Sequence, residues 1–242
     1  MRTRHLAAAG LAAAAAAAIT VPGSAAAPPS VLARPASHFS ATSAHVTNPY
    51  FPLKPGTRFV YRGQKDGQRS RDIFDATRQT QRIDGVLCRV VHDRLYLRGV
   101  LHERTTDWYA QSDSGDVWYF GERTAELDRN GKVVSREGSW TSGKRGARAG
   151  VYITARPRVG QTRAQEHFPG HAEDHFKVLD TSAHVTVPLL SSGHAVLTKE
   201  WTPLEPAVLD HKFYVRDIGM IREASVKGPV EIGNLVAIRH LR

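Results

Sequence analysis

Alternation of apolar and polar residues with a period of two dominates the sequence after residue 46, and this pattern limits the possible folds most strongly. A period of two places every second side chain on one face of a strand, whereas an amphipathic helix needs a period of 3.6. We expect strands at residues 57–62, 70–77, 86–97, 101–111, 117–120, 150–154, 162–168, 176–187, 195–201, 209–215, 220–225 and 230–239. One short stretch, residues 173–179, fits a helical turn instead. The sequence therefore predicts a mainly β protein.

Short turn sequences separate several of these runs. Residues 65–67 (Lys-Asp-Gly) and 113–116 (Asp-Ser-Gly-Asp) are typical hairpin turns, and the Asn130-Gly131 pair suits a type I′ turn. Strands joined in sequence by short turns form an antiparallel meander. Such a sheet must close or curl to bury its apolar face. We therefore expect a curved half-barrel or barrel, with a two-sheet sandwich as the alternative.

The N-terminal segment has the order of charges and small residues that is typical of a secretory signal peptide. Arg2 and Arg4 precede an apolar stretch over residues 6–21, and small residues then surround Ala26. An alanine-rich membrane anchor is the alternative, but about 16 weakly apolar residues are short for a membrane span. We expect cleavage after Ala26, no transmembrane anchor in the mature chain, and a secreted location, extracellular or in the cell envelope.

The rest of the chain divides into two parts. Residues 27–45 are rich in Ala, Pro and Ser, which is typical of a flexible linker. Residues 46–242 are long enough for one β-rich domain. The single cysteine, Cys88, excludes a disulfide framework and a thiolate zinc finger. It lies inside a strand-forming run, where a buried and inert thiol is expected.

Four segments of the chain carry a resemblance to a known group of proteins. They are NPYFPLKPGT (48–57), DWYAQ (107–111), VWYFGE (117–122) and EWTPLEP (200–206), and they resemble an uncharacterised family of secreted, actinobacterial-type bacterial proteins without an established activity. Residues 214–223, which include IGMI, are similar to the last strands of lipoprotein-carrier-like half-barrels. That second resemblance implies an acyl chain bound in the hollow of the sheet.

Positive charge suggests an anionic partner. The chain has a formal net charge of +10, and residues 138–165 contain no acid. Within this interval, Lys144, Arg145 and Arg148 lie in a Gly-rich loop that could grip phosphate or carboxylate groups of an envelope polymer or lipid. The alternative is a solvated loop. A nucleic-acid partner is not expected, because an exported protein rarely meets one and no recognised binding motif is present.

One cluster contains residues of the types that bind metal ions. His167, His171, Glu173, Asp174 and His175 lie within nine residues, and imidazoles and carboxylates are common ligands of divalent ions. The cluster does not match the His-Glu-x-x-His pattern of zinc hydrolases. A polar surface loop is the favoured interpretation, a buried carboxylate paired with an arginine is another, and we expect no cofactor.

Other catalytic patterns are sparse. No Gly-x-Ser-x-Gly nucleophile motif is present in the sequence. Asp107, Glu122, Glu200 and Glu205 lie near aromatic residues, so two of them could flank a sugar as acid and nucleophile. The alternative is that these aromatic residues belong to the core or to cross-strand pairs.

Two functional hypotheses follow. The first is a secreted, non-enzymatic binding or carrier protein that holds an apolar or amphiphilic ligand. The second is an extracellular hydrolase that depends on a metal or on paired carboxylates. A dry apolar hollow without convergent acids would favour the carrier, whereas convergent histidines and carboxylates would favour the hydrolase.

Overall fold

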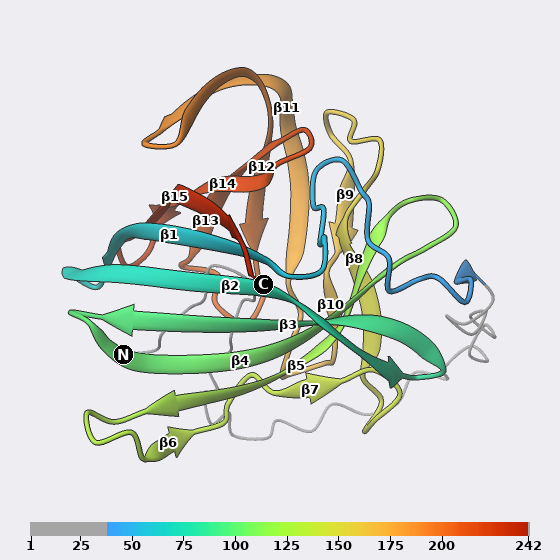
Figure 1. The fold of residues 1–242 in the computed structure, drawn as a ribbon, viewed down its shortest axis with the longest axis horizontal. Helices are drawn as coiled ribbons and strands as arrows, with labels where there is room; N and C mark the ends of the chain where they lie inside the picture. The colour runs from blue at the N-terminus through green and yellow to red at the C-terminus, as the bar shows by residue number, and fades with distance from the viewer. Residues whose placement is uncertain (1–37, 242) are drawn as a thin grey trace, which may run out of the picture.

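Fifteen strands and no α-helix make up the part of the chain that the computed structural model describes, residues 38–241 (Figure 1). The strands are β1 (Thr57–Lys65), β2 (Gln68–Ile83), β3 (Val86–Leu97), β4 (Val100–Gln111), β5 (Val117–Leu127), β6 (Val133–Ser135), β7 (Trp140–Thr141), β8 (Arg148–Ile153), β9 (Thr162–Ala164), β10 (Glu166–His167), β11 (His175–Val187), β12 (Leu190–Trp201), β13 (Leu209–Val215), β14 (Gly219–Lys227) and β15 (Glu231–His240). The predicted signal peptide, residues 1–26, lies outside the described residues. No helix that is long and apolar enough to cross a membrane occurs in the described range.

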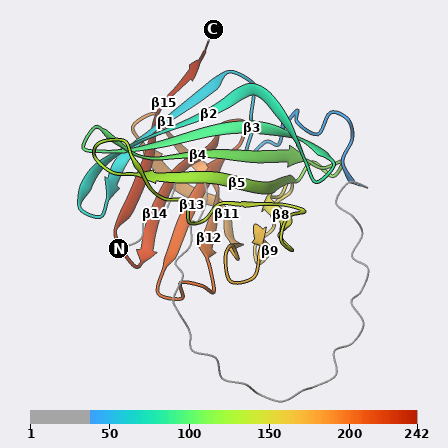
Figure 2. The same cartoon turned by 90° about the horizontal axis from the view of Figure 1, so that it is seen from below.

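The strands follow one another around a nearly closed barrel. Their order in the sheet is β10-β8-β5-β4-β3-β2-β1-β15-β14-β13-β12-β11-β9, and the pairs along it are antiparallel. The two ends of this path meet because only Gln165 separates β9, which pairs with β11, from β10, which pairs with β8. Figure 2 shows β1–β5 crossing over β11–β14 as two walls. The predicted antiparallel meander and barrel are confirmed.

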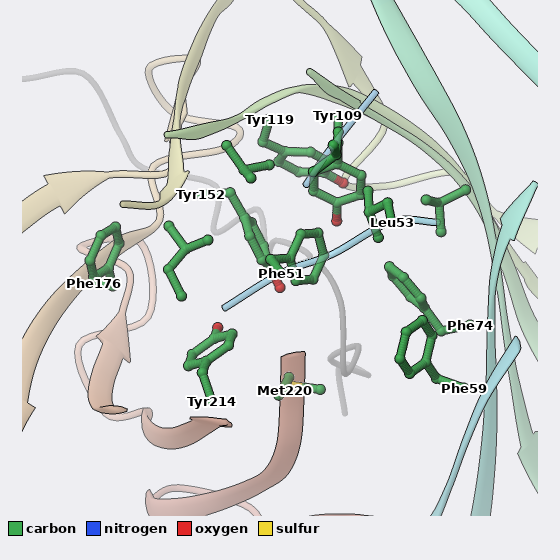
Figure 3. Packing of buried hydrophobic residues seen from close by; sticks show 14 of the residues in the cluster. Phe51, Leu53, Phe59, Phe74, Tyr109, Tyr119, Tyr152, Phe176, Tyr214 and Met220 are labelled. Atoms are coloured by element: carbon green, nitrogen blue, oxygen red, sulfur yellow. The ribbon is translucent and has the colours of Figure 1, made fainter. Parts of the chain in front are cut away.

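Aromatic side chains fill one end of the barrel (Figure 3). Residues 46–53 enter this end before β1, and the Phe51 ring lies 5.2 Å from Tyr109 and 4.6 Å from Tyr152, centroid to centroid. A cavity of only about 10 Å³ remains among the side chains around Phe51, Phe59 and Phe74. That volume is too small for an acyl chain, so this end of the interior is packed core.

Residues 38–45, which the sequence predicts as the end of the linker, lie against the sheet. The Phe39 ring lies 5.4 Å from Phe120, centroid to centroid. The Ser43 hydroxyl donates to the Leu87 carbonyl at 2.7 Å, and the carbonyl of the buried Ala44 accepts from Arg89 at 3.1 Å. These contacts show that the packed chain begins before residue 46. The Ala- and Ser-rich composition predicts a linker because it gives little weight to Phe39, the aromatic residue that anchors this stretch.

The expected helical turn at residues 173–179 does not form. β11 begins at His175 and pairs with β9 on one side and β12 on the other. Phe176 and Val178 both point into the core and are buried. The alternation of this stretch therefore prevails over its helix-forming residues, because two neighbouring strands satisfy the hydrogen bonds of its backbone.

The turn at residues 128–132 also differs from the expected type I′ geometry. Asn130 does not have a positive φ, whereas Gly131 does, at 80°. The Asp128 carboxylate accepts hydrogen bonds from the backbone N–H groups of Asn130 and Lys132, both at 2.9 Å. This side-chain cap stabilises a different turn. At residues 66–67, by contrast, Asp66 and Gly67 both have positive φ, as a type I′ turn requires.

Candidate functional site

The loop predicted to bind anions is firmly anchored. The Ser142 N–H donates to the Phe120 carbonyl at 2.9 Å, and the Ser142 hydroxyl donates to Asp84 at 3.0 Å. Gly143 has a φ of 78°, and a Cβ at this position would lie 2.7 Å from Asp84 Oδ1. Glycine is therefore required here. The loop presents Lys144 and Arg145 to solvent.

A pocket of about 370 Å³ lies beside this loop. Lys144 and Arg145 line it together with Arg123 of β5, and the Arg145 guanidinium lies 5.6 Å from the Phe168 ring centroid. Trp108 and Trp140 form much of its largely buried floor. The other lining residues are Gln81, Ile83, Glu122, Ser139 and Thr141. Two of the three cations singled out in the sequence, Lys144 and Arg145, therefore line one pocket.

The third residue of the predicted set lies elsewhere. Arg148 is exposed at the start of β8, directly opposite His167 of β10, and is not part of the pocket lining. Partial burial and the nearby Arg148 charge lower the pKa of His167. The structure therefore brings together Lys144 and Arg145 but separates them from Arg148.

A second and larger pocket, of about 730 Å³, adjoins the first because Arg123 lines both. Arg94 of β3 and Arg104 of β4 are cross-strand partners in it, and Arg136 completes its charged lining. The remaining lining residues are His92, Asp93, Leu101, Thr105, Thr106 and Ala125. We call the combined surface of Arg94, Arg104, Arg123, Arg136, Lys144 and Arg145 the basic outer face.

Sequence reasoning missed four of these six cations. Each strand from β3 to β5 contributes a single outward arginine, so no run of basic residues marks the site. Only the register places Arg104 beside Arg94 and Arg123 beside Thr106. One of the charges is already compensated, because Asp75 forms ion pairs with both Arg58 and Arg94.

The interior of the barrel has the opposite charge. Twelve carboxylates are buried, more than half of the 23 in the chain, although the net charge is +10. They are Asp72, Asp75, Asp93, Glu103, Asp107, Glu122, Glu166, Asp174, Glu200, Asp210, Glu223 and Glu231. Apart from Asp75, which pairs with Arg58 and Arg94, and Asp174, which directly precedes β11, they belong to the inward pattern of their strands. Two buried lysines, Lys65 and Lys212, accompany them.

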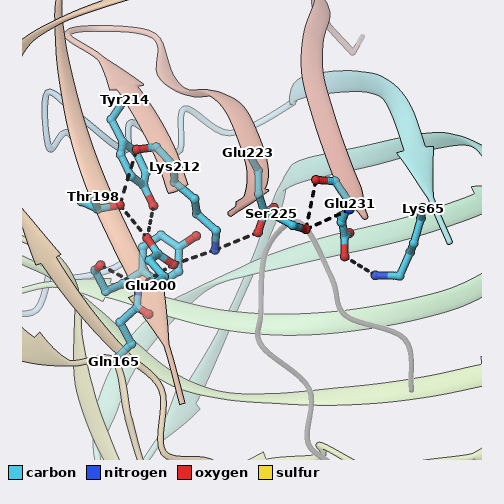
Figure 4. Close-up of polar contacts among 10 residues, drawn as sticks. Lys65, Gln165, Thr198, Glu200, Lys212, Tyr214, Glu223, Ser225 and Glu231 are labelled. Carbon is cyan, nitrogen blue, oxygen red and sulfur yellow. Dashed lines mark hydrogen bonds and ion pairs between the residues drawn. The ribbon is translucent and has the colours of Figure 1, made fainter. Parts of the chain in front are cut away.

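On the wall formed by β12–β14, the buried charges are compensated (Figure 4). Lys212 Nζ lies 2.7 Å from Glu200 and 3.7 Å from Glu223. Thr198 and Tyr214 donate hydrogen bonds to Glu200 at 3.0 and 3.1 Å. Burial opposes the charge of Lys212, but the two glutamates outweigh it and hold the pKa of this ammonium well above its usual value. Lys65 similarly pairs with Glu231 at 2.6 Å.

On the wall formed by β2–β5, four carboxyl groups lie in a line without an inward lysine. We call Asp72, Asp93, Asp107 and Glu122 the acidic line. Asp107 is directly opposite Glu122, and Asp93 and Asp72 follow diagonally on β3 and β2. Burial raises the pKa of all four carboxyls, that of Asp72 to about 7, and repulsion by neighbouring carboxylates raises them further.

The hypothetical metal cluster is spread over several elements. His167 is exposed on β10, the His171 ring stacks on Phe168 at 4.4 Å, and the His175 ring stacks on Trp201 at 5.6 Å. Glu173 accepts a hydrogen bond from the Gly170 N–H, and Asp174 is buried. Among the described residues, no group of three or more His, Cys, Asp or Glu is arranged to hold a metal ion.

The carboxylates considered for sugar hydrolysis fall into separate places. Asp107 and Glu122 face each other across β4 and β5, and Tyr119 donates a 2.7 Å hydrogen bond to Asp107. Glu200 belongs to the Lys212 network, and Glu205 lies in the turn between β12 and β13. Burial raises the pKa of the Cys88 thiol, so this cysteine is not a nucleophile at neutral pH.

Comparison with known proteins gives likeness in fold alone. No protein-family model matches the chain, and no curated protein matches its sequence significantly. A protein of proposed export with a YmcC-like fold, from Bacteroides fragilis, matches 78% of this chain and 98% of its own at 16% identity and a TM-score of 0.45. A proposed lipoprotein from Parabacteroides distasonis matches 78% and 97% at 10% identity and a TM-score of 0.42. At these values, the likeness carries no inference about function.

Proposed function

We propose that this chain is a secreted, non-enzymatic binding protein that attaches to an anionic polymer of the cell envelope through its basic outer face. One observation carries the proposal: two pockets that share Arg123 place six cationic side chains along one continuous surface. Repeated negative charges on a polymer match such an extended row, whereas a compact anion would use only part of it.

The chemistry of the side chains favours phosphate groups. Five of the six cations are arginines, whose planar guanidinium groups bind phosphate through two parallel hydrogen bonds. Burial and the nearby Arg94 charge lower the pKa of His92, so this imidazole is neutral at pH 7 and adds no charge to the surface. The attraction therefore depends on arginine and lysine and should persist across neutral pH.

The outer face is favoured over the interior as the site of this function. The aromatic end of the barrel is packed, and the β2–β5 wall carries buried acids and no inward lysine to bind an anion. An apolar or acyl ligand would meet packed side chains at one end and polar carboxyl groups along this wall. A hydrolase remains a second candidate only through the opposed pair Asp107 and Glu122.

Co-sedimentation with an insoluble phosphate-bearing wall polymer tests the proposal. Binding should weaken as salt rises, because charges on an exposed surface are screened over about 8 Å at physiological ionic strength. The Arg104→Ala/Arg123→Ala/Lys144→Ala variant should lose at least about tenfold in affinity, by analogy with the salt-sensitive loss of several phosphate contacts.

The matched control removes three exposed arginines that line neither pocket, Arg156, Arg158 and Arg163. This control has the same change in net charge and should retain most of the binding. Equal losses in the two variants would mean that net charge alone attracts the polymer. Stronger binding to anionic vesicles than to the polymer would replace the polymer with a lipid surface.

A further inference from the structure

The two pockets of the basic outer face differ in composition. The larger one, of about 730 Å³, is lined by arginines such as Arg104 and Arg136, and its described lining contains no tryptophan, tyrosine or phenylalanine. The smaller one, of about 370 Å³, combines its cations with the aromatic residues Trp108, Trp140 and Phe168. Phosphate groups alone do not require aromatic neighbours, so the smaller pocket suits a ligand with a further chemical feature.

We propose that the smaller pocket binds a sugar ring that carries a phosphate group, as one unit of the anionic polymer. This inference rests on the attachment proposed above and names the unit that is recognised. A sugar ring has apolar C–H faces and a polar edge of hydroxyl groups, which match a pocket of mixed lining. Its volume of about 370 Å³ lies at the lower end of the range for small-molecule sites, roughly 300–1,000 Å³, so it suits one ring rather than a longer segment.

Trp108 and Gln81 supply an apolar surface and a polar edge to this pocket. The Trp108 side chain lies among buried apolar residues of the neighbouring strands, and its indole N–H donates to Gln81 Oε1 at 3.0 Å. That bond fixes the ring and orients the amide of the exposed Gln81. The amide N–H groups of Gln81 can then donate to a sugar hydroxyl.

The cations of the pocket lack acidic partners. Among the described residues, no ion pair joins Arg123, Lys144 or Arg145 to a carboxylate, whereas Arg94 in the larger pocket pairs with Asp75. Glu122 also lines the pocket, but it is 1% exposed and burial raises the pKa of its carboxyl. Three uncompensated cations around one small pocket favour a group with a double negative charge, such as a phosphate monoester.

Arg145 is the cation best placed to hold this phosphate beside the rings. Its guanidinium lies 5.6 Å from the Phe168 ring centroid, so the charge and the apolar surface are adjacent. Its φ of 53° lies in the left-handed region, which favours glycine and is strained for arginine. Strained backbone positions occur often at binding sites, where the side chain must be held in one place.

The strained backbone gives a variant that removes the charge without endangering the fold. Glycine adopts a φ of 53° more easily than arginine, so Arg145→Gly should fold like the wild type. Isothermal titration with glucose 1-phosphate and glycerol 1-phosphate compares a ring and a linear molecule with the same phosphate group. The wild type should bind glucose 1-phosphate at least about tenfold more tightly, because the ring buries additional C–H surface. Arg145→Gly should lower the affinity for both at least about tenfold.

The matched control is Arg98→Gly. Arg98 is exposed, has a φ of 51° and lines neither pocket of the outer face, so the change in charge and in backbone strain is the same. This variant should bind both phosphates like the wild type. Phe168→Leu should reduce the preference for glucose 1-phosphate but leave the affinity for glycerol 1-phosphate unchanged.

The sugar site is overturned if the wild type binds the two phosphates equally well, or if Arg145→Gly binds glucose 1-phosphate as tightly as Arg98→Gly does. It is also overturned if glucose without phosphate binds as tightly as glucose 1-phosphate. Polymer binding without a preference for glucose 1-phosphate would leave the attachment intact and remove only the sugar site. Preferential binding of glucose 1-phosphate without any polymer binding would remove the attachment and leave a site for a free sugar phosphate.

Discussion

The two inner walls of the barrel differ in what offsets the charge of their buried acids. On the β12–β14 wall, Lys212 lies between Glu200 and Glu223, and hydrogen bonds from Thr198 and Tyr214 complete the network. On the β2–β5 wall, each carboxyl group has another carboxyl group as its neighbour. Burial and mutual repulsion raise their pKa values, so these groups hold protons where the other wall has a lysine. A lysine thus offsets the buried glutamates of one wall, whereas, within the described part of the chain, the acids of the other wall have no lysine beside them.

The largest expected effect comes from breaking the compensated wall. Lys212→Met keeps much of the volume of the side chain but leaves Glu200 and Glu223 without their shared cation. Removing one partner of a buried ion pair typically costs about 3–5 kcal/mol, because the remaining charge stays desolvated. Chemical denaturation at pH 7 measures the free energy of unfolding.

A matched control for this variant lies on the neighbouring strand. Lys199 is on β12, and its ammonium lies 4.9 Å from the Trp201 ring centroid. It is half-buried, and Lys199→Met should cost less than about 1 kcal/mol. Similar losses in the two variants would show that the buried network does not stabilise the fold as a compensated group.

The second prediction concerns the uncompensated wall and pH. The folded state raises the pKa of Asp72 from 3.8 to about 7 and raises that of Asp93 as well. The unfolded chain therefore gives up these protons first, at lower pH. The stability that protonation provides is complete below about pH 4 and is lost as pH rises toward 7 and beyond. We expect the free energy of unfolding to fall by about 2–4 kcal/mol between pH 4 and pH 8.

Asparagine substitutions separate this wall from other titrating groups. Asp72→Asn/Asp93→Asn should flatten the pH dependence and make the protein more stable than the wild type at pH 8, because an amide has no charge to desolvate. Denaturation midpoints at pH 5 and pH 8 provide the comparison. A wild type that is equally stable at both values would contradict the protonated state of this wall.

The sequence predicts the fold well because its signal is local. Residues 86–97 and 209–215 were predicted as strands and form β3 and β13 with the same bounds. Alternation and Gly-containing turns require no knowledge of distant residues. Antiparallel strands in sequence order then leave few ways to bury the apolar face other than a curved or closed sheet.

The acidic interior could not be predicted from the same signal. Binary patterning reserves inward positions for apolar residues, so it does not mark an inward acid such as Asp93, which alternates with the buried Val91 and Leu95. At Glu122 the local backbone is irregular as well. Gly121, with a φ of 122°, occupies an irregular stretch of β5 where a Cβ would lie 2.4 Å from the Trp140 carbonyl oxygen, and Glu122 follows it opposite Asp107. The aromatic neighbours of Asp107 and Glu122 were the one available signal.

The smallest expected effect comes from the ion pairs outside the barrel. Asp75 accepts hydrogen bonds from Arg58 at 2.6 and 2.8 Å and also pairs with Arg94. Because the Arg58 side chain is 29% exposed, water solvates much of its charge, and the Asp75 carboxylate, which is 8% exposed, keeps Arg94 as a partner. Arg58→Gln should therefore cost about 0.5–1 kcal/mol, and less at high salt, since Arg94 still compensates Asp75. Denaturation at low and high salt measures the loss in free energy of unfolding and its dependence on salt. A loss near that of Lys212→Met, or one that salt does not reduce, would contradict the prediction. Solvent access would then not distinguish this ion pair from the network on the inner wall.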